Sequence, residues 1–386
     1  MYAKLNTLPA LLALLALGSA AHADDTLQTR VDETIRPLMA EHDIAGMAVA
    51  ITHNGQAHYF NYGVARLDDP QPVSSDTLFE IGSLSKPLTA TLAALAQATG
   101  KLTLADSAGQ HWPELQGSKL EHASLLNLGT YTAGGLPLQF PDNVTDPASM
   151  LAYYRQWQPE YAAGTHRRYS NPSIGLLGML AAKSMGQPFP TLMEGTLFPA
   201  LGMSHSYIQV PTAQLPRYAF GYSKDNQPLR VTPGMLDAEA YGVKTTARDM
   251  LRFVQANLNP AGLNKDLQRA IAMTHTGYYR VGEMTQGLGW ERYPYPISLE
   301  RLQAGNSPAM ALESQPATRL APPESEPSDS LFNKTGSTGG FGAYAVFVPS
   351  QNLGLVMLAN KNYPNAARIK AAHAILSALD KNAAPH

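Results

Sequence analysis

Two lysine motifs, far apart in the chain, have the residue types that serine-based acyl transfer needs. A Ser-x-x-Lys sequence at Ser83 and Lys86 would bring a hydroxyl and an amine to one helix face, because residues three apart are neighbours on a helix. A Lys-Thr-Gly sequence that begins at Lys334 supplies a second amine. Burial and a neighbouring cation both disfavour an ammonium group, so the second lysine would help Lys86 to take the serine proton. The pair predicts an acyl-enzyme formed without histidine.

The order of the motifs along the chain carries more weight than any one of them. Chance supplies a Ser-x-x-Lys sequence roughly once in a chain this long, and a Lys-Thr-Gly sequence on the order of one time in ten. Each of the two occurs once here. A third motif, Tyr-x-Asn, occurs three times, starting at Tyr59, Tyr169 and Tyr363. Order along the chain selects Tyr169, which lies between the two lysine motifs.

The segments around these residues predict how they are positioned. An apolar helix is expected over residues 86–99, ended by Gly100, so that Ser83 lies in or just before its first turn. A second helix is expected to start at Asn171-Pro172, since Asn can cap a helix and Pro suits the first helical position. Tyr169 then lies in the entering loop and can point into a cleft. Asn171 can serve as a cap, as a substrate ligand or as both.

Strand patterns at both ends of the chain predict an α+β fold. The expected elements are a helix over 25–41, strands over 46–51 and 57–64 around an Asn54-Gly55 turn, strands over 332–335, 343–348 and 353–359, and a closing helix over 365–379. The terminal segments, 24–80 and 290–386, should share one sheet flanked by helices. Residues 81–289 form an inserted, mainly helical lobe, with the site in the cleft between the lobes. The Pro- and Ser-rich stretch 307–329 is interpreted as a surface loop.

Composition excludes several classes of protein. Of 386 residues, 44% are hydrophobic and 15% charged, which is typical of a compact globular enzyme. The formal charge of −2 gives no basis for binding nucleic acid or an anionic membrane. The chain has no cysteine, so neither disulfides nor thiolate chemistry is available.

The first 23 residues have the pattern of a secretory signal. One positive charge at Lys4 precedes an apolar stretch over residues 8–17, and small residues follow up to Ala23. The apolar stretch is shorter than the roughly 20 residues that cross a bilayer, so cleavage after Ala23 is expected rather than a membrane anchor. The mature chain would then have 386 − 23 = 363 residues and would be exported.

The ordered motifs resemble those of the class C serine β-lactamases, the cephalosporinases. The matching segments are 83–86 (SLSK), 131–139 (YTAGGLPLQ), 169–171 (YSN), 237–242 (DAEAYG), 334–342 (KTGSTGGFG) and 360–365 (NKNYPN). They extend over essentially the whole mature chain. The resemblance implies the serine β-lactamase and penicillin-binding-protein fold, with an antiparallel sheet. It also implies a periplasmic enzyme, expected to be a monomer, that needs no cofactor or metal and acts on a small-molecule β-lactam.

The resemblance also implies a role for individual residues. Ser83 would be the acylated nucleophile, Lys86 and Tyr169 the proton-transfer groups, and Lys334 their electrostatic partner. The backbone N–H groups of Ser83 and Ser337 would form an oxyanion hole. The substrate-binding residues would be Gln139 and Asn171 for the amide side chain, Thr335, Asn362 and Asn365 near the carboxylate, and Tyr241 as a wall of the cleft. Which group is the base in each step stays open, as does whether Arg368 supports the anion site or is a surface charge.

Other functions remain as alternatives at this stage. The same residues could serve a D-alanyl-D-alanine carboxypeptidase, a β-lactamase-fold esterase or a penicillin-binding sensor domain. A metallo-hydrolase is disfavoured because none of the 11 histidines lies in a His-x-His or His-Glu-x-x-His arrangement. No Gly-x-Ser-x-Gly sequence supports a Ser-His-Asp hydrolase either. Asn333, where many class C enzymes have His, and the 307–329 stretch are departures that affect substrate preference rather than the reaction.

Overall fold

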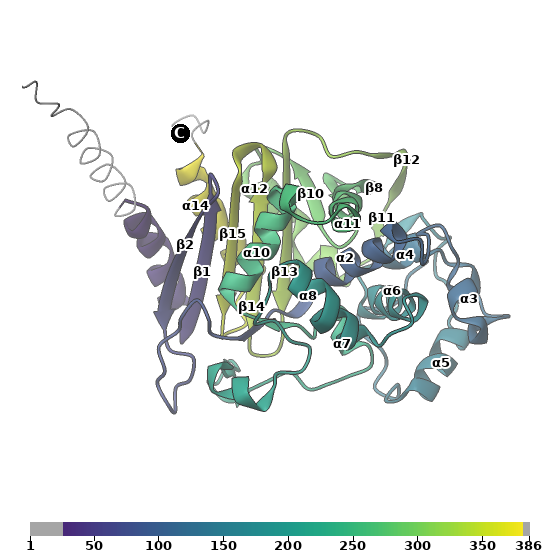
Figure 1. Cartoon of the computed structure of the whole chain (residues 1–386), viewed down its shortest axis with the longest axis horizontal. Coiled ribbons are helices and arrows are strands. Elements are labelled where there is room, and N and C mark those ends of the chain that lie inside the picture. Colours follow the sequence, from purple (N-terminus) through teal and green to yellow (C-terminus); the bar gives the residue numbers. More distant parts are fainter. Residues whose placement is uncertain (1–25, 381–386) are drawn as a thin grey trace, which may run out of the picture.

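A nine-stranded antiparallel sheet is the centre of the fold (Figure 1). The computed structural model describes residues 26–380. The strand order is β12-β8-β9-β10-β13-β14-β15-β1-β2. The bounds are β1 Gly46–His53, β2 Gln56–Gly63, β8 Gly277–Val281, β9 Met284–Gln286, β10 Glu291–Pro294, β12 Thr318–Glu324, β13 Ser330–Ser337, β14 Gly342–Val348 and β15 Leu353–Ala359. Since β1 pairs with β15, the two ends of the chain share one sheet, as the sequence predicted.

Local chemistry explains the first hairpin. Asn54 and Gly55, between β1 and β2, both have positive φ angles, of 52° and 81°. Asn and Gly tolerate this conformation, and a two-residue turn of this kind suits the right-handed twist of paired strands. The turn sets the register in which His53 lies opposite Gln56.

Helices cover both faces of the sheet. On one face, the helix over residues 26–41 and α14 (Asn365–Leu379) pack on alternate strand residues such as Met47, Val49 and Met357. On the other face, the intervening residues, among them Ala48 and Val356, contact a second and larger core. Every residue of β14 and β15 is buried, which fits strands that are covered on both sides.

The mainly helical part lies beside this sheet and is built around α2 and α6, which lie side by side (Figure 1). Almost all of α2 is buried. Across residues 26–380 the helices other than α14 and the one over 26–41 are α2 Ser85–Ala98, α3 Ala108–His111, α4 Leu125–Gly129, α5 Pro147–Gln156, α6 Asn171–Ser184, α7 Phe189–Leu192, α8 Phe198–Ala200, α9 Asp237–Ala240, α10 Ala247–Leu258, α11 Lys265–His275, α12 Leu299–Gly305 and α13 Pro308–Leu312. Short strands pair separately: β3 Phe79–Glu80 with β7 Lys244–Thr245, β4 His166–Arg167 with β11 Gln315–Pro316, and β5 Gly221–Tyr222 with β6 Pro228–Leu229.

The structure differs from the sequence-based expectation in two segments. The interpretation of 307–329 as a loop is wrong, because this stretch contains α13, β11 and the edge strand β12. The segment predicted as the helical lobe, 81–289, also contains two strands of the large sheet, β8 and β9. The signal segment 1–23 lies outside the described residues. Within 26–380, no helix has the length and apolar character needed to cross a membrane.

Candidate active site

Ser83 lies in a short turn, residues 82–84, whose backbone packs directly against the end of β13. We call this turn the nucleophile turn. Ser83 is the central residue of this 3₁₀ turn, Gly82–Leu84, which leads directly into α2. Gly82 has a φ of +50°, and a Cβ atom there would lie 2.4 Å from the carbonyl oxygen of Ser337. A Cβ atom at Gly336 would lie 2.0 Å from the carbonyl oxygen of Ile81. Only glycine permits an approach this close, so both glycines are needed to place Ser83 beside the Lys-Thr-Gly strand.

Lys86 is fully buried and is hydrogen-bonded to Ser83, the candidate nucleophile. Its Nζ donates to Ser83 Oγ at 2.8 Å, to Asn171 Oδ1 at 2.6 Å and to the carbonyl oxygen of Ala240 at 2.8 Å. All three acceptors are neutral, so none offsets the loss of water around an ammonium group. Burial therefore lowers the pKa of the Lys86 amine to about 8, and the positive charge of Lys334 acts in the same direction. The amine is thus poised to exchange a proton with the serine.

Tyr169 lies between the two lysines. The Nζ atoms of Lys86 and Lys334 are 5.0 Å and 4.9 Å from the centre of its ring, and the ring of Tyr131 packs against it at 4.9 Å. Burial by itself would raise the pKa of the Tyr169 phenol. The nearby ammonium groups of Lys334 and Lys86 outweigh burial, and the pKa falls below its ordinary value. Tyr169 is therefore a second group that can hold or release a proton in the site.

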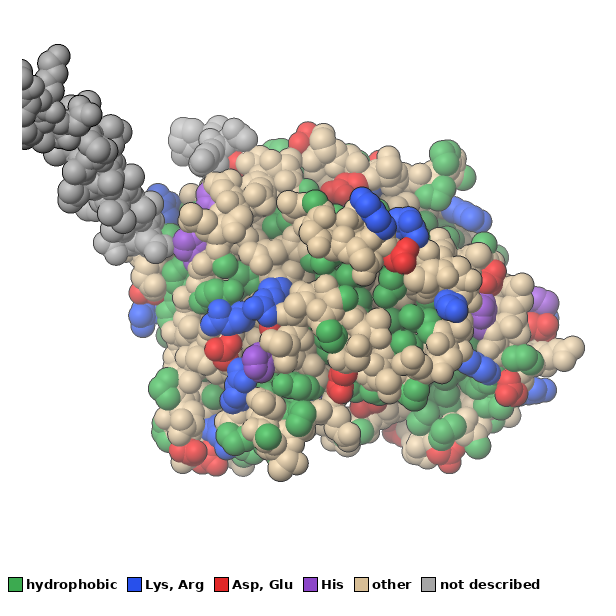
Figure 2. All heavy atoms as spheres, in the orientation of Figure 1, with side chains coloured by type: hydrophobic (Ala, Val, Ile, Leu, Met, Phe, Trp, Pro, Cys, Tyr) green, Lys and Arg blue, Asp and Glu red, His purple; other side chains and the backbone are tan. Residues whose placement is uncertain are grey.

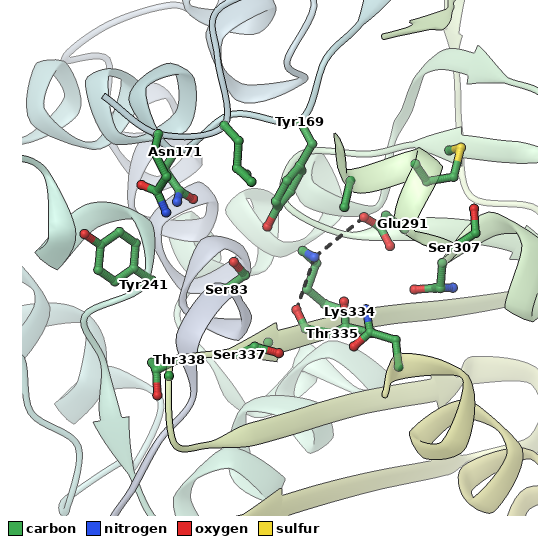
Figure 3. A pocket seen from close by; sticks show the side chains of 18 of the residues that line it. Ser83, Tyr169, Asn171, Tyr241, Glu291, Ser307, Lys334, Thr335, Ser337 and Thr338 are labelled. Atoms are coloured by element: carbon green, nitrogen blue, oxygen red, sulfur yellow. Dashed lines mark hydrogen bonds and ion pairs between the residues drawn. The ribbon is translucent and has the colours of Figure 1, made fainter. Parts of the chain in front are cut away.

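Lys334 is also buried, but unlike Lys86 it has an anionic partner. Its Nζ lies 3.6 Å from Glu291 Oε1 and donates to the carbonyl oxygen of Thr335 at 3.2 Å (Figure 3). Burial would lower the pKa of this amine, but the Glu291 carboxylate raises it above its ordinary value. Glu291 also pairs with Arg167 at 3.3 Å, and both side chains are buried. Lys334 consequently stays protonated and acts as a fixed positive charge beside Tyr169.

These groups open into a cleft of about 430 Å³ between the sheet and the helical part. The catalytic candidates Ser83, Tyr169 and Lys334 line it, together with the predicted substrate-binding residues Gln139, Asn171, Tyr241, Thr335 and Asn365, and with Ser337 of the expected oxyanion hole. Figure 3 shows Tyr241 on one side of Ser83 and the β13 residues on another. The structure therefore brings together residues from six separate sequence segments.

Asn362 is not among the described residues that line the cleft. Its Oδ1 accepts a hydrogen bond from Arg368 at 2.8 Å. Arg368 itself is fully buried rather than a surface charge, and it donates to the carbonyl oxygen of Gly336 at 2.6 Å and to Ser337 Oγ at 3.0 Å. Burial lowers the pKa of this guanidinium to about 10. Asn362 and Arg368 thus support the end of β13 from outside the cleft.

The cap of α6 is Ser170 rather than Asn171. Ser170 Oγ accepts the N–H of Ser173 at 3.0 Å, which leaves the side chain of Asn171 free to accept from Lys86. Arg167 and Glu291 are site residues that sequence analysis missed. The only sequence signal for either one was a charged residue, next to a motif for Arg167 and in the short segment 291–294 (ERYP) for Glu291, and neither signal is specific.

The described residues contain no candidate metal site. Across residues 26–380, no group of three or more His, Cys, Asp or Glu side chains has a geometry that could hold a metal ion. On the face that Figure 2 shows, acidic and basic side chains are interspersed rather than gathered by sign.

Comparison with known proteins places the chain in a family. A family model described as Beta-lactamase matches residues 31–380. The chain belongs to the β-lactamase family. A β-lactamase of Pseudomonas fluorescens is 60% identical to it over 351 residues, which are 91% of this chain and 98% of the relative.

Solved structures extend the assignment to class C. A class C β-lactamase in complex with cefoxitin matches with a TM-score of 0.90 and 48% identity, over 92% of this chain and 99% of the other. A structure described as a β-lactamase/D-alanine carboxypeptidase from Pseudomonas syringae matches with a TM-score of 0.90 and 49% identity, over 93% and 100% of the two chains. The class C resemblance and the serine β-lactamase fold predicted from the motifs are confirmed.

The buried ion pairs around Glu291 predict a large loss of stability in a Glu291→Gln variant of this β-lactamase family member. The change leaves the Arg167 and Lys334 cations buried without an anion, and breaking a buried pair in this way costs about 3–5 kcal/mol. Chemical denaturation would measure the free energy of unfolding. Glu283→Gln is the matched control, because Glu283 pairs with Arg301 at the surface, and such a pair contributes at most about 1 kcal/mol. Equal losses in the two variants would contradict the expectation.

Proposed function

We propose that this protein hydrolyses the β-lactam ring of cephalosporins and penicillins through an acyl-enzyme on Ser83, and so confers resistance to these antibiotics. The observation that carries the proposal is the 2.8 Å hydrogen bond between Lys86 Nζ and Ser83 Oγ, made by an amine whose pKa burial lowers to about 8. A serine hydroxyl is a weak nucleophile until an adjacent base takes its proton. The buried Lys86 amine meets that need beside Ser83, which lines the cleft.

In the acylation step, Ser83 Oγ bonds to the lactam carbonyl carbon and the ring C–N bond breaks. The serine proton passes through Lys86 or Tyr169 to the lactam nitrogen, which leaves as an amine still tethered to the product. In deacylation, a water molecule adds its oxygen to the ester carbon, and its proton returns to Ser83 Oγ as the ester bond breaks. No Glu-x-x-Leu-Asn sequence supplies a separate deacylating base, so Tyr169, Lys86 or the substrate itself activates the water.

Negative charge on the carbonyl oxygen would be stabilised by the backbone N–H groups of Ser83 and Ser337. The close packing of Gly82 against Ser337 supports this role, because it fixes the two backbones next to each other. One such donor typically contributes about 2.7–4 kcal/mol to transition-state stabilisation. Lys334, Thr335 and Asn365 would attract the carboxylate of the substrate.

The other substrate-binding roles are assigned from the residues that line the cleft. Gln139 and Asn171 would hydrogen-bond the amide side chain of the antibiotic, and Tyr241 would form a wall beside it. Asn362 would contribute by holding Arg368 rather than by touching the substrate. We further propose a monomer exported to the periplasm after removal of residues 1–23, without a membrane anchor and without a cofactor. It would have two lobes, with β8 and β9 counted in the sheet lobe.

Hydrolysis of a chromogenic cephalosporin by the purified mature chain tests the proposal. Turnover that survives EDTA supports it, and failure to turn over any cephalosporin or penicillin overturns it. A D-alanyl-D-alanine carboxypeptidase is the second candidate, favoured by the name of the Pseudomonas syringae relative. Mass spectrometry after mixing with penicillin separates the two. A peptidase keeps a long-lived penicilloyl adduct on Ser83. A β-lactamase hydrolyses the adduct before the first mass spectrum can be recorded.

The pKa of Lys86 predicts the pH dependence of the reaction. The neutral amine is the form that takes the serine proton, and its fraction rises as pH passes through about 8. We expect kcat/KM, which reports on the free enzyme, to rise along a limb with an apparent pKa near 8. Charge on Tyr169 raises the pKa of Lys86, so Tyr169→Phe should shift this limb to lower pH. A limb that disappears in Tyr169→Phe would instead assign the titration to the tyrosine. Because the two groups are coupled, the wild-type value belongs to the pair.

A further inference from the structure

We propose that Glu80 is a positioning residue that holds two walls of the cleft against the Ser83 turn, an inference that rests on the acyl-enzyme function proposed above. Glu80 ends β3, three residues before Ser83. Its side chain is 1% exposed and is not among the described residues that line the cleft. Glu80 therefore does not touch substrate, and any effect it has on turnover must act through its neighbours.

Three neutral donors converge on this carboxylate. The Tyr218 hydroxyl donates to Oε1 at 2.6 Å, the backbone N–H of Val231 donates to the same oxygen at 2.8 Å, and the Thr338 hydroxyl donates to Oε2 at 2.6 Å. Hydrogen bonds to an ionised acceptor are stronger than neutral ones, typically about twice as strong. Two of the three donors, Val231 and Thr338, belong to residues that line the cleft. The carboxylate therefore joins two residues of the cleft lining to the strand that precedes Ser83.

The contact with Thr338 fixes the turn that follows β13, the strand that ends at Ser337 of the proposed oxyanion hole. We call this turn, residues 338–341, the oxyanion corner. Thr338 directly follows Ser337 at the end of β13, and its N–H donates to the carbonyl oxygen of Phe341 at 3.1 Å across the turn. Figure 3 shows Ser337 and Thr338 adjacent to each other below Ser83. Holding the Thr338 hydroxyl therefore limits how far the N–H of Ser337 can move from the acyl carbonyl.

The contact with Val231 fixes a second part of the cleft wall. Val231 belongs to the segment between β6 and α9, and this segment leads to Ala240, whose carbonyl oxygen accepts from Lys86. The residues that form this wall, Val231, Thr232 and Tyr241, all come from this one stretch of chain. Without the hydrogen bond to Glu80, the Val231 N–H would have to find another partner, and the wall would be free to shift.

Glu80 also directly precedes the nucleophile turn, with only Ile81 between them. Ile81, the next residue, is bonded through its N–H to the carbonyl oxygen of Val243, and Gly336 packs directly on its carbonyl oxygen. One carboxylate thus sets the positions of the nucleophile turn, the oxyanion corner and the Val231 wall relative to one another. A misplacement of about 1 Å in such a site can cost on the order of 100-fold in rate.

Two substitutions at Glu80 separate hydrogen bonding from charge. In Glu80→Gln, the remaining oxygen can still accept from Tyr218 and Val231, and the amide can donate to the Thr338 hydroxyl, so we expect kcat within about 3-fold of wild type. Glu80→Met keeps the size but removes every acceptor. We expect it to lower kcat by about 10- to 100-fold and to change KM much less, with assays run well below the melting temperature and rates divided by the fraction of Ser83 that can be acylated.

A double-mutant cycle with Thr338→Val tests the path through the oxyanion corner. If Glu80 acts by holding the Thr338 hydroxyl, then Thr338→Val lowers kcat in the wild-type background and has little further effect in Glu80→Met. Additive effects of the two changes would overturn this path. A lower melting temperature in Glu80→Met with unchanged kcat and KM would overturn the inference altogether, because Glu80 would then be a structural anchor only.

The rate at which penicillin acylates Ser83, followed by mass spectrometry, keeps the two proposals distinguishable. Wild-type turnover together with unchanged Glu80 variants rejects the role of Glu80 and leaves the proposed function standing. A wild type that is acylated but not turned over rejects β-lactam hydrolysis, and slower acylation in Glu80→Met would still support the positioning role. A wild type that is neither acylated nor active rejects both.

Discussion

Ser83→Ala is expected to reduce β-lactam hydrolysis by about 10⁴-fold or more, since removal of the nucleophile leaves only binding and oxyanion stabilisation. The change removes one oxygen atom from a turn that backbone packing holds in place, so the fold should persist. Steady-state hydrolysis of a chromogenic cephalosporin measures the loss, and mass spectrometry should show no covalent adduct.

Ser350→Ala is the matched control for this experiment. Ser350 lies exposed in the turn between β14 and β15, at the opposite end of β14 from Gly342, the residue that pairs with Ser337. We expect wild-type rates from this variant. If Ser83→Ala kept substantial activity or still formed the adduct, another residue would be the nucleophile, and the mechanism proposed above would be wrong.

Lys86→Met should reduce kcat/KM by about 10²- to 10⁴-fold, the range that positioned proton transfer contributes. Methionine approximates the length of the lysine stem but offers no proton acceptor to Ser83. It also leaves Asn171 Oδ1 and the carbonyl oxygen of Ala240 without the donor they have now, so part of the loss reflects a disturbed site.

Two measurements separate these contributions. A circular dichroism melt of Lys86→Met reports on the disturbance, and the rate of Ser83 acylation by penicillin reports on the proton transfer. Lys370→Met, at an exposed position of α14, is the control for loss of a positive charge and should behave as wild type. Acylation at the wild-type rate in Lys86→Met would show that Tyr169 is the base.

The contrast between Lys86 and Lys334 explains how one site can use two lysines differently. Both amines are buried, and burial by itself lowers the pKa of either one. Lys334 has the Glu291 carboxylate at 3.6 Å, which reverses the shift, whereas Lys86 has only neutral acceptors. The ion-paired lysine keeps its charge and the other can lose it. The carboxylate of Glu291 thus decides which amine is available as a base.

Much of the fold could be predicted from local pattern. The strands near 343–359 and the helix over 365–379 have strong periodicity and clear turn residues, and the structure has them at nearly the expected bounds. Strand β12 could not be found in this way. It is an edge strand with largely exposed residues and two adjacent prolines, which an edge tolerates because some of its N–H groups need no partner. Its pairing with β8 is a tertiary contact without a local signal.

The sequence by itself determined the family, since the ordered motifs at Ser83, Tyr169 and Lys334 predicted the β-lactamase resemblance that the comparisons confirm. Only the tertiary structure decided the electrostatics. Glu291 and Arg167 lie far apart in the chain, and their effect on Lys334 depends on distance and burial, which no motif encodes. The same holds for Glu80, a lone carboxylate in sequence that becomes the meeting point of three segments. Motifs record which groups react, whereas pKa values and positions arise from what folding packs around them.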